Sequence, residues 1–211
     1  MARGRATKTI RVPDLFATAA RRDGIICGID EAGRGPLAGP VVAAAVILLP
    51  EARHLPLNDS KKLDEGQRET LFAALQSCAI IGVGQASVDE IDRINILQAT
   101  FLAMQRAFSA LAQPPALALI DGNRAPRLPC PVETIVGGDG LEPSIAAASI
   151  VAKVTRDRLM VALHAEDPRY GFAQHKGYGT PGHLESLVVH GPGPHHRLSF
   201  APLKRSVDDS G

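Results

Sequence analysis

Residues 25–36, which read IICGIDEAGRGP, constrain this chain more than any other segment. The segment begins with a short apolar run that is typical of a buried β-strand, and two adjacent acids, Asp30 and Glu31, follow it. A carboxylate at the end of a buried strand is costly unless a partner neutralises it, and Mg²⁺ prefers carboxylate oxygen. Gly33 and Gly35 let backbone N–H groups approach a ligand closely. The segment therefore predicts a metal site beside an anion-binding turn, which suits chemistry on a phosphate.

An acidic pair at a strand end can also be an ordinary solvated turn, so a second feature is needed to favour the metal. Asp121 supplies it, because this acid also follows a buried apolar run, residues 116–120, and precedes a glycine. Acids at the ends of different strands converge where α/β sheets usually place their sites. The sequence therefore predicts that the acids of the two segments meet at one edge of a sheet.

The composition fits a single α/β domain with a small appendage. The chain has 211 residues, of which 45% are hydrophobic and 21% charged, and no apolar run approaches the roughly 18 residues of a membrane span. Its three cysteines are odd in number and show no metal-like spacing, so we expect buried thiols in a reduced, cytoplasmic setting. The net charge of +1 does not indicate a strongly basic nucleic-acid binder, and the distribution of charge matters more than the total.

Three regions differ in composition. Residues 1–22 contain several arginines and one lysine among few acids, and we interpret them as a flexible basic arm, with a phosphate-binding arm, a targeting segment and a solvated tail as alternatives. Residues 23–165 form the predicted catalytic domain. Residues 166–211 are rich in glycine, proline and histidine, and we expect a C-terminal helical extension that covers the cleft of the site.

The order of the predicted elements favours a mixed sheet with helices on its faces. Predicted strands cover residues 24–30, 37–49, 79–86, 116–120 and 132–136. Capping-box patterns at Asp64 and Ser87 begin the first two helices, the second with one apolar stripe from Ile94 to Leu111. Ser144 is the expected cap of a third helix and Thr180 that of a fourth. The early hairpin and the lack of a G-x-G-x-x-G motif disfavour a doubly wound nucleotide-binding fold.

Two local expectations concern the ends of elements. Adjacent residues on a strand face opposite sides, so we expect the first strand to end at Asp30 and Glu31 to lie in the turn. Five histidines in the C-terminal region fit no standard zinc spacing, and we expect them at the surface: His175, His183, His190, His195 and His196.

Five blocks together resemble bacterial ribonuclease HII, a type 2 ribonuclease H. They are residues 30–36 (DEAGRGP), 59–63 (DSKKL), 120–122 (IDG), 146–153 (AAASIVAK) and 176–180 (KGYGT), in the order found in that family. The resemblance extends over about residues 24–203. It implies a ribonuclease H-like mixed five-stranded sheet flanked by helices, with the small C-terminal extension.

The resemblance also implies an endonuclease activity and its substrates. Members of the family hydrolyse RNA in RNA–DNA hybrids and cut 5′ of single ribonucleotides in duplex DNA, leaving a 3′-hydroxyl and a 5′-phosphate. This chain is therefore expected to bind such hybrids and ribonucleotide-containing duplexes, to act in ribonucleotide excision, to work as a monomer and to have no membrane partner.

By the same resemblance, four carboxylates hold two divalent ions, Mn²⁺ or Mg²⁺. The matching positions are Asp30, Glu31, Asp121 and Asp139. The backbone around the turn recognises the 2′-hydroxyl of the ribose, Tyr178 stacks on the neighbouring deoxyribose, and further residues bind the substrate backbone. The expected substrate-binding residues are Gly33, Arg34, Gly35, Ser60, Lys61, Lys153 and Tyr178.

Several alternatives stay open at this point. Glu142 and Asp157 compete with Asp139 for the place of the fourth acid, Lys153 can simply pair with Asp157 one helical turn later, and Tyr178 can be a buried core residue. For the whole chain, the alternatives are a metal-dependent nuclease without ribose selectivity and a nucleic-acid-binding module without turnover.

Overall fold

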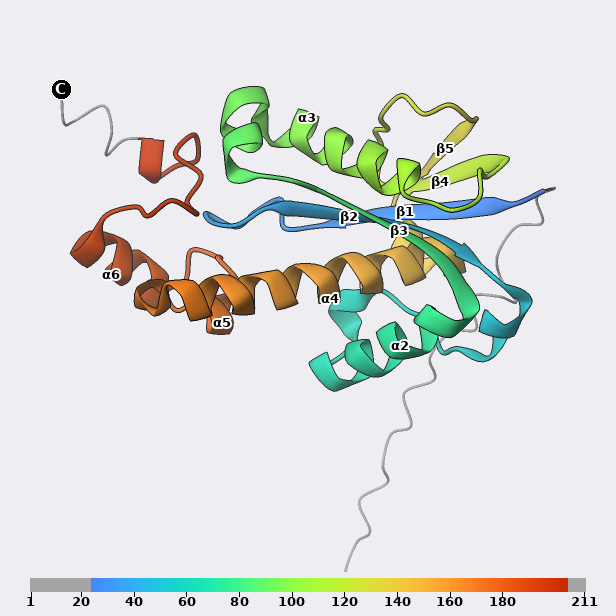
Figure 1. The fold of residues 1–211 in the computed structure, drawn as a ribbon, viewed down its shortest axis with the longest axis horizontal. Coiled ribbons are helices and arrows are strands. Elements are labelled where there is room, and N and C mark those ends of the chain that lie inside the picture. The colour runs from blue at the N-terminus through green and yellow to red at the C-terminus, as the bar shows by residue number, and fades with distance from the viewer. Residues whose placement is uncertain (1–23, 205–211) are drawn as a thin grey trace, which may run out of the picture.

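The computed structural model describes residues 24–204, so the predicted basic arm at residues 1–22 and the last seven residues lie outside the described part. Its centre is a five-stranded sheet with the order β3-β2-β1-β4-β5 (Figure 1). The strands are β1 (Ile26–Ala32), β2 (Val41–Leu48), β3 (Ala79–Ala86), β4 (Leu117–Asp121) and β5 (Val132–Ile135). The first three strands pair antiparallel, whereas β4 and β5 continue the sheet in parallel with β1. The predicted mixed sheet and early hairpin are confirmed.

Helices cover both faces of this sheet (Figure 1). One face carries α3 (Val88–Ser109), and the other carries α2 (Glu65–Cys78) and α4 (Pro143–Glu166). The short α5 (Phe172–His175) and α6 (Pro181–His190) follow at the C-terminal end of α4. Within residues 24–204, none of the helices combines the length and apolar composition needed to cross a membrane.

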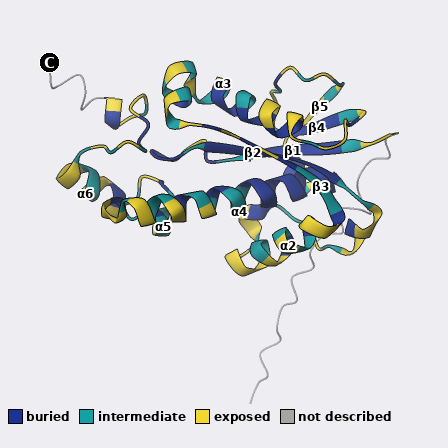
Figure 2. Ribbon diagram, in the orientation of Figure 1, coloured by how far each residue is buried: buried dark blue, intermediate teal, exposed yellow. Residues whose placement is uncertain are grey.

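Two hydrophobic cores hold the three layers together. The central strand β2 is buried on both faces, as the continuous apolar sequence VVAAAVIL requires. Its odd-numbered residues, such as Ala43, pack toward α3, and its even-numbered residues, such as Ala44, pack toward α2 and α4. A Cβ at Gly28 would lie 2.1 Å from the carbonyl carbon of Ser144, so α4 lies directly on β1. The buried core follows the sheet in Figure 2.

The helices follow the sequence except at the beginning of α4 and at one position inside α3. Asp64 and Ser87 form the predicted capping boxes of α2 and α3. The prediction for Ser144 is wrong, because Pro143 already occupies the first turn of α4 and Glu142 is the N-cap. The continuous stripe on α3 is interrupted, because Asn95 has φ 66° and its side chain caps the N–H groups of Leu97 and Gln98.

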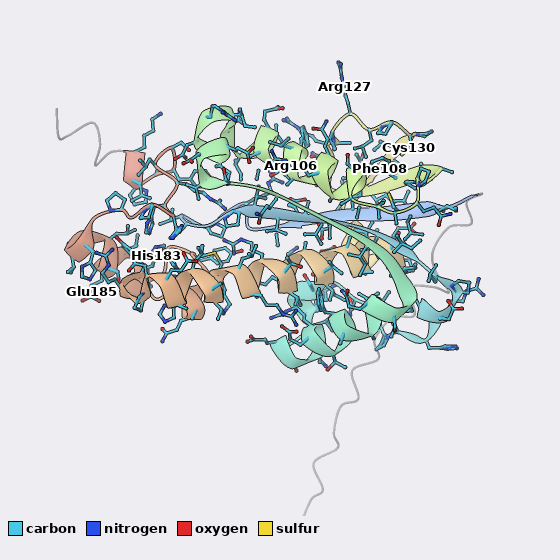
Figure 3. The ribbon with its side chains drawn as sticks, in the orientation of Figure 1. Arg106, Phe108, Arg127, Cys130, His183 and Glu185 are labelled. Atoms are coloured by element: carbon cyan, nitrogen blue, oxygen red, sulfur yellow. The ribbon has the colours of Figure 1, made fainter. Side chains whose placement is uncertain are left out.

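The C-terminal extension packs on the end of α4 through a small core of Ala38, Met160, Tyr170 and Phe172. The expectation of surface histidines is wrong for His183 and His196, whereas His190 is exposed as expected and His175 and His195 are half-buried. His183 is fully buried and His196 is 2% exposed, and their Nε2 atoms lie 3.0 Å apart. Figure 3 labels His183 on α6. Glu185, two residues later on the same helix, is exposed near the outer end of the molecule.

The beginning of the second strand also differs from the prediction. Residues 37–40 are not part of β2. Ala38 forms an isolated antiparallel bridge with His196, and Leu37 N–H donates to Gly177 O. The segment after the glycine-rich turn is therefore paired with the C-terminal extension.

Candidate active site

The predicted strand-end acids meet at one edge of the sheet. Asp30 and Glu31 lie on β1, and Asp121 ends the neighbouring parallel strand β4, where Ile120 is in register with Ile29. The expectation that β1 ends at Asp30 is wrong, because the strand continues to Ala32. Pairing with β2 keeps both acids in regular β geometry.

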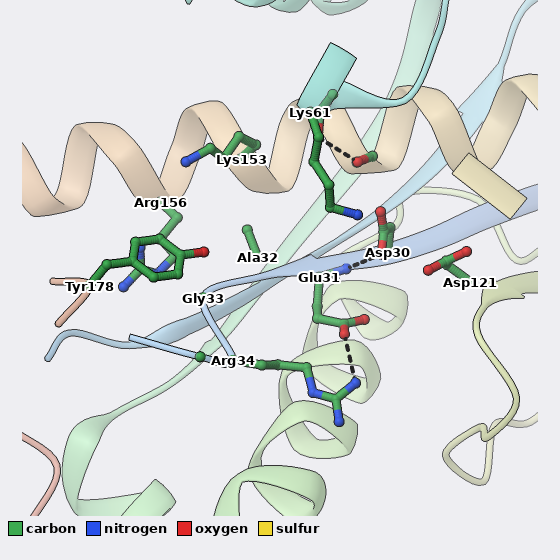
Figure 4. A pocket seen from close by; sticks show the side chains of 13 residues that line it. Asp30, Glu31, Ala32, Gly33, Arg34, Lys61, Asp121, Lys153, Arg156 and Tyr178 are labelled. Atoms are coloured by element: carbon green, nitrogen blue, oxygen red, sulfur yellow. Dashed lines mark hydrogen bonds and ion pairs between the residues drawn. The ribbon is translucent and has the colours of Figure 1, made fainter. Parts of the chain in front are cut away.

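The two adjacent acids consequently face opposite sides of the strand, as Figure 4 shows. Asp30 faces α4 and is 4% exposed, whereas Glu31 projects to the other side, beside Arg34. Both still border one cavity, because β4 stops at Asp121 and leaves the edge of β1 open beyond Ile29. The early end of β4, rather than a bend in β1, gives both acids access to the same space.

This cavity has a volume of about 240 Å³ and collects residues from all five sequence blocks. It contains every predicted site residue except Asp139. Its lining consists of Asp30, Glu31, Ala32, Gly33, Arg34, Gly35, Ser60, Lys61, Asp121, Ser149, Lys153, Arg156 and Tyr178.

A hydroxyl pair orients Asp30 from the side of α4. Ser149 donates a side-chain hydrogen bond to Asp30, and its hydroxyl lies 2.7 Å from that of Ser60. The N–H of Glu31 donates to Asp30 Oδ1 at 2.7 Å. Asp121 is similarly anchored, because the N–H of Gly138 donates to its Oδ1 at 2.7 Å. These bonds fix the carboxylates while leaving oxygen atoms available to a ligand.

The electrostatics of the site favour a bound cation. Burial, with further repulsion from Glu31 and Asp121, raises the pKa of Asp30 well above its ordinary value. Burial also raises the pKa of Glu31 and of Asp139. The pKa of Lys61 is raised, because Asp139 and Asp59 outweigh the opposing effect of burial. The nearby cations Arg34 and Lys61 do not bring the pKa values of these acids back to their ordinary range, and a divalent ion would supply further positive charge.

The three rivals for the fourth acid occupy different surroundings. Asp139 is 7% exposed in the short 3₁₀-helix Gly138–Gly140, and its Oδ2 lies 3.3 Å from Lys61 Nζ. Glu142 is equally buried but lies at the N-cap of α4. Asp157 pairs with Lys153 at 2.8 Å. Asp139 faces a cation that itself lines the cavity, and it stays our prediction for the fourth acid.

The glycine-rich turn and Tyr178 border the other end of the cavity. Gly33 has φ +95°, a conformation that favours glycine, and a Cβ there would lie 1.9 Å from Arg156 Nε. Arg34 Nη1 lies 3.2 Å from Glu31 Oε1. Tyr178 is 47% exposed, so the alternative of a buried core tyrosine is wrong. Its ring lies next to Arg156 and the turn (Figure 4).

Sequence reasoning missed three residues that belong to this arrangement. Ser149 lies within the block of residues 146–153, where the sequence showed only that it is a small residue and gave it no role at the site. Arg156 and Arg197 resemble surface cations in the sequence, yet they are 1% and 0% exposed. No local signal identifies them, because their partners are main-chain carbonyls more than one hundred residues away for most of their bonds.

The chain matches the family model described as Ribonuclease HII over residues 27–203. A ribonuclease HII from Paramagnetospirillum magneticum is 59% identical over 196 residues, which covers 91% of this chain and 97% of the relative. The fold resembles the ribonuclease H2 from Pyrococcus horikoshii OT3, with a TM-score of 0.72, 25% identity and coverage of 88% of this chain and 98% of that one. It also resembles Bst-RNase HIII, solved in complex with Mn²⁺, with a TM-score of 0.69, 18% identity and coverage of 93% and 72%. The chain therefore belongs to the ribonuclease HII family of endoribonucleases.

Proposed function

We propose that this endoribonuclease cleaves RNA in RNA–DNA hybrids and cuts 5′ of single ribonucleotides in duplex DNA, leaving a 3′-hydroxyl and a 5′-phosphate. The observation that carries the proposal is one cavity that joins Asp30, Glu31 and Asp121 to the turn at Gly33–Gly35 and to Tyr178. The acids provide a site for phosphate chemistry, and the turn and the tyrosine provide a means of recognising one sugar.

Four acids would hold two divalent ions, Mg²⁺ or Mn²⁺: Asp30, Glu31, Asp121 and Asp139. Among the described residues, no three His, Cys, Asp or Glu side chains are grouped so that they could hold one ion together. Mg²⁺ is commonly bound through one or two carboxylates, with water and substrate phosphate as the other ligands, and the open acid cluster fits that mode. When bound, two such ions activate a water and stabilise the leaving oxygen of an in-line displacement.

The remaining residues position the nucleic acid. The N–H groups of the turn are available to the 2′-hydroxyl, which distinguishes RNA from DNA. The exposed face of Tyr178 can stack on the next sugar, so the C-terminal extension contributes directly to the substrate cleft. Ser60, Lys61 and Lys153 line the same cavity and would bind the phosphates that flank the cut.

Three substrates test this proposal: a DNA duplex with one ribonucleotide, the same duplex in all-DNA form, and an RNA–DNA hybrid. We expect one cut 5′ of the single ribonucleotide and many cuts in the hybrid with Mg²⁺ or Mn²⁺, and none in EDTA. Equal cutting of the all-DNA duplex would instead show a nuclease without ribose selectivity. Binding without cutting in either metal would show a non-catalytic module.

A further inference from the structure

Two buried arginines lie directly behind the glycine-rich turn. Arg156 comes from α4 and Arg197 from the C-terminal segment, and both are almost completely buried. Neither forms a salt bridge with an acid among the described residues. Two buried cations of the same sign are costly, and burial lowers the pKa of Arg197 to about 9, with a further contribution from Arg156. Arg197 is nevertheless charged at neutral pH, so its hydrogen bonds must offset this cost.

Arg197 binds the carbonyl groups of the turn itself. Its Nη2 donates to Gly33 O at 2.6 Å, and its Nη1 donates to Arg34 O at 2.9 Å. Its Nε and Nη2 also donate to Gly39 O, at 2.9 and 2.7 Å. A planar guanidinium therefore fixes both ends of the segment that contains Gly33 and Arg34.

The direction of these carbonyls determines the direction of two N–H groups. In a planar trans peptide the C=O and the following N–H point in opposite directions. When the carbonyls of Gly33 and Arg34 point toward Arg197, the N–H groups of Arg34 and Gly35 must point away from it. Both residues line the cavity on that opposite side. Neither N–H makes a hydrogen bond within residues 24–204, so both are available to a ligand.

Arg156 connects this turn to the segment that carries Tyr178. Its Nε and Nη2 donate to Pro40 O at 3.0 Å and Ala38 O at 3.1 Å, on the chain that leaves the turn. Its Nη1 donates to Lys176 O at 3.0 Å, two residues before the tyrosine. One guanidinium thus sets the spacing between the turn and the aromatic ring.

We infer that Arg197 and Arg156 are positioning residues for ribose recognition: Arg197 directs the N–H groups of Arg34 and Gly35 into the cavity, and Arg156 fixes this turn relative to Tyr178. The inference rests on the proposed function, because it explains how the substrate sugar is recognised. A positive charge at these two positions is not sufficient to hold the turn. A lysine places one ammonium where a fork of three nitrogens now holds several carbonyls in fixed directions.

The first test measures binding in EDTA, where no cleavage takes place, to two duplexes that differ only in one 2′-hydroxyl. The ratio of the two Kd values reports ribose recognition and does not depend on the fraction of active protein. We expect Arg197→Lys and Arg156→Lys to lower this preference by up to about tenfold, the upper range for a hydrogen bond between the neutral N–H groups of the turn and the 2′-hydroxyl. Arg158→Lys, an exposed position on α4 that pairs with Glu69, should retain it.

Thermal melts establish that each variant is folded at the assay temperature. If Arg197→Lys does not fold, Arg197→Met fills the same buried space without placing a cation there, and it must show the same loss of preference. A folded variant at either arginine that retains the wild-type preference would overturn the inference. So would a wild-type protein that cuts ribonucleotides selectively but binds the two duplexes equally. Wild-type protein that cuts neither ribose substrate would overturn the proposed function, and the inference with it.

A double-mutant cycle isolates the spacing set by Arg156. Arg156→Lys should lower kcat/KM on the single-ribonucleotide duplex by about tenfold in the wild-type background and by much less in the Tyr178→Ala background, because the ring to be positioned is then gone. Arg158→Lys serves as the control, and its effect on kcat/KM should be the same in the wild-type and Tyr178→Ala backgrounds. Equal losses in both backgrounds would show that Arg156 only supports the fold.

Discussion

The acid cluster and the arginine pair are both groups of like charges that the fold buries, but they are satisfied in opposite ways. Burial, with repulsion from neighbouring acids, raises the pKa values of Asp30, Glu31 and Asp139, although Arg34 contacts Glu31 and Lys61 contacts Asp139. Arg156 and Arg197 have carbonyl acceptors on every side of their guanidinium groups. The acids are incomplete without a ligand, whereas the arginines are complete without one. The acid cluster is therefore suited to binding a ligand and to catalysis, and the arginine pair to fixing the conformation of the backbone around it.

The largest expected effect tests the acids. Asp139→Asn should lower cleavage by about a thousandfold or more, because the loss of one metal ligand removes several kcal/mol of transition-state stabilisation. The same change relieves repulsion with Asp59 and Asp121, so the melting temperature should stay the same or rise. Cleavage kinetics and a thermal melt on one preparation measure both.

Asp157→Asn is the matched control, because this acid is bound to Lys153 on α4 and should cut nearly as the wild type. If Asp139→Asn remains active while Asp157→Asn is inactive, the fourth ligand has been assigned to the wrong acid.

The arginine pair predicts the opposite pattern of stability. Arg197→Met leaves the carbonyls of Gly33, Arg34 and Gly39 without donors, and breaking a buried charged network costs about 3 to 5 kcal/mol. For a domain of this size the melting temperature should fall by roughly 10 °C.

Arg158→Met should melt within about 2 °C of the wild type, because exposed ion pairs contribute little. If Arg197→Met melts at as high a temperature as Arg158→Met, the hydrogen bonds of Arg197 do not stabilise the fold, and the contrast between the acid cluster and the arginine pair is wrong.

The histidines beside the arginines give a pH dependence. Burial lowers the pKa of His196 to about 4, against about 6.5 for the free side chain. The unfolded chain therefore binds this proton first. Between pH 6.5 and about 4, the contribution of His196 to stability, about 3 to 3.5 kcal/mol, is lost as the pH falls. Urea unfolding at several pH values measures it.

His196→Gln should flatten this slope, and His190→Gln, at an exposed position, should leave it unchanged. Only the difference between variant and wild type is informative. The acids with raised pKa values, Asp30, Glu31 and Asp139, stabilise the folded state as the pH falls through their pKa values and so act with the opposite sign. A His196→Gln curve parallel to the wild type would show that His196 does not titrate in this range.

The contrast also explains what could be predicted from the sequence. The capping boxes and the early hairpin are local patterns, and the structure contains both, although β1 continues past Asp30 and β2 begins later than predicted. Asp30 and Glu31 were recognisable because a glycine-rich turn follows them and because Asp121 occupies the same kind of position on a second strand. The fold class followed from the order of such segments.

The rest depends on partners that are distant in sequence. Whether Arg197 is buried depends on carbonyls near residue 34, more than 160 positions away. His183 is buried because His196 and Phe172 surround it. The continuation of β1 past Asp30 depends on pairing with β2 and on the earlier end of β4. None of these features has a periodicity or a cap that a single segment could show.

Tyr178 borders the end of the cavity away from the acids, next to Arg156 (Figure 4), and its removal should separate recognition from chemistry. Tyr178→Ala should reduce cutting at a single embedded ribonucleotide about tenfold more than cutting of a long RNA–DNA hybrid, since a stacking contact is worth about 1–3 kcal/mol. Rates on both substrates with the same preparation measure the difference. Equal losses would place the tyrosine in support of the fold or of the acids instead.

Lys153 provides the smallest expected effect. It lines the cavity, but unlike Arg34 and Lys61 it pairs with an acid outside the acid cluster. It is held 2.8 Å from Asp157 by a helical i, i+4 pair worth at most about 0.5 kcal/mol, which a phosphate can replace. Lys153→Met should weaken binding to all duplexes alike, several-fold at low salt, and reduce the salt dependence by about one unit in the log–log slope. Asp157→Asn frees the ammonium group and should change affinity slightly in the other direction. If neither substitution alters the salt dependence, Lys153 and Asp157 are only a surface ion pair of α4, and the phosphate contacts come from Lys61 and the turn.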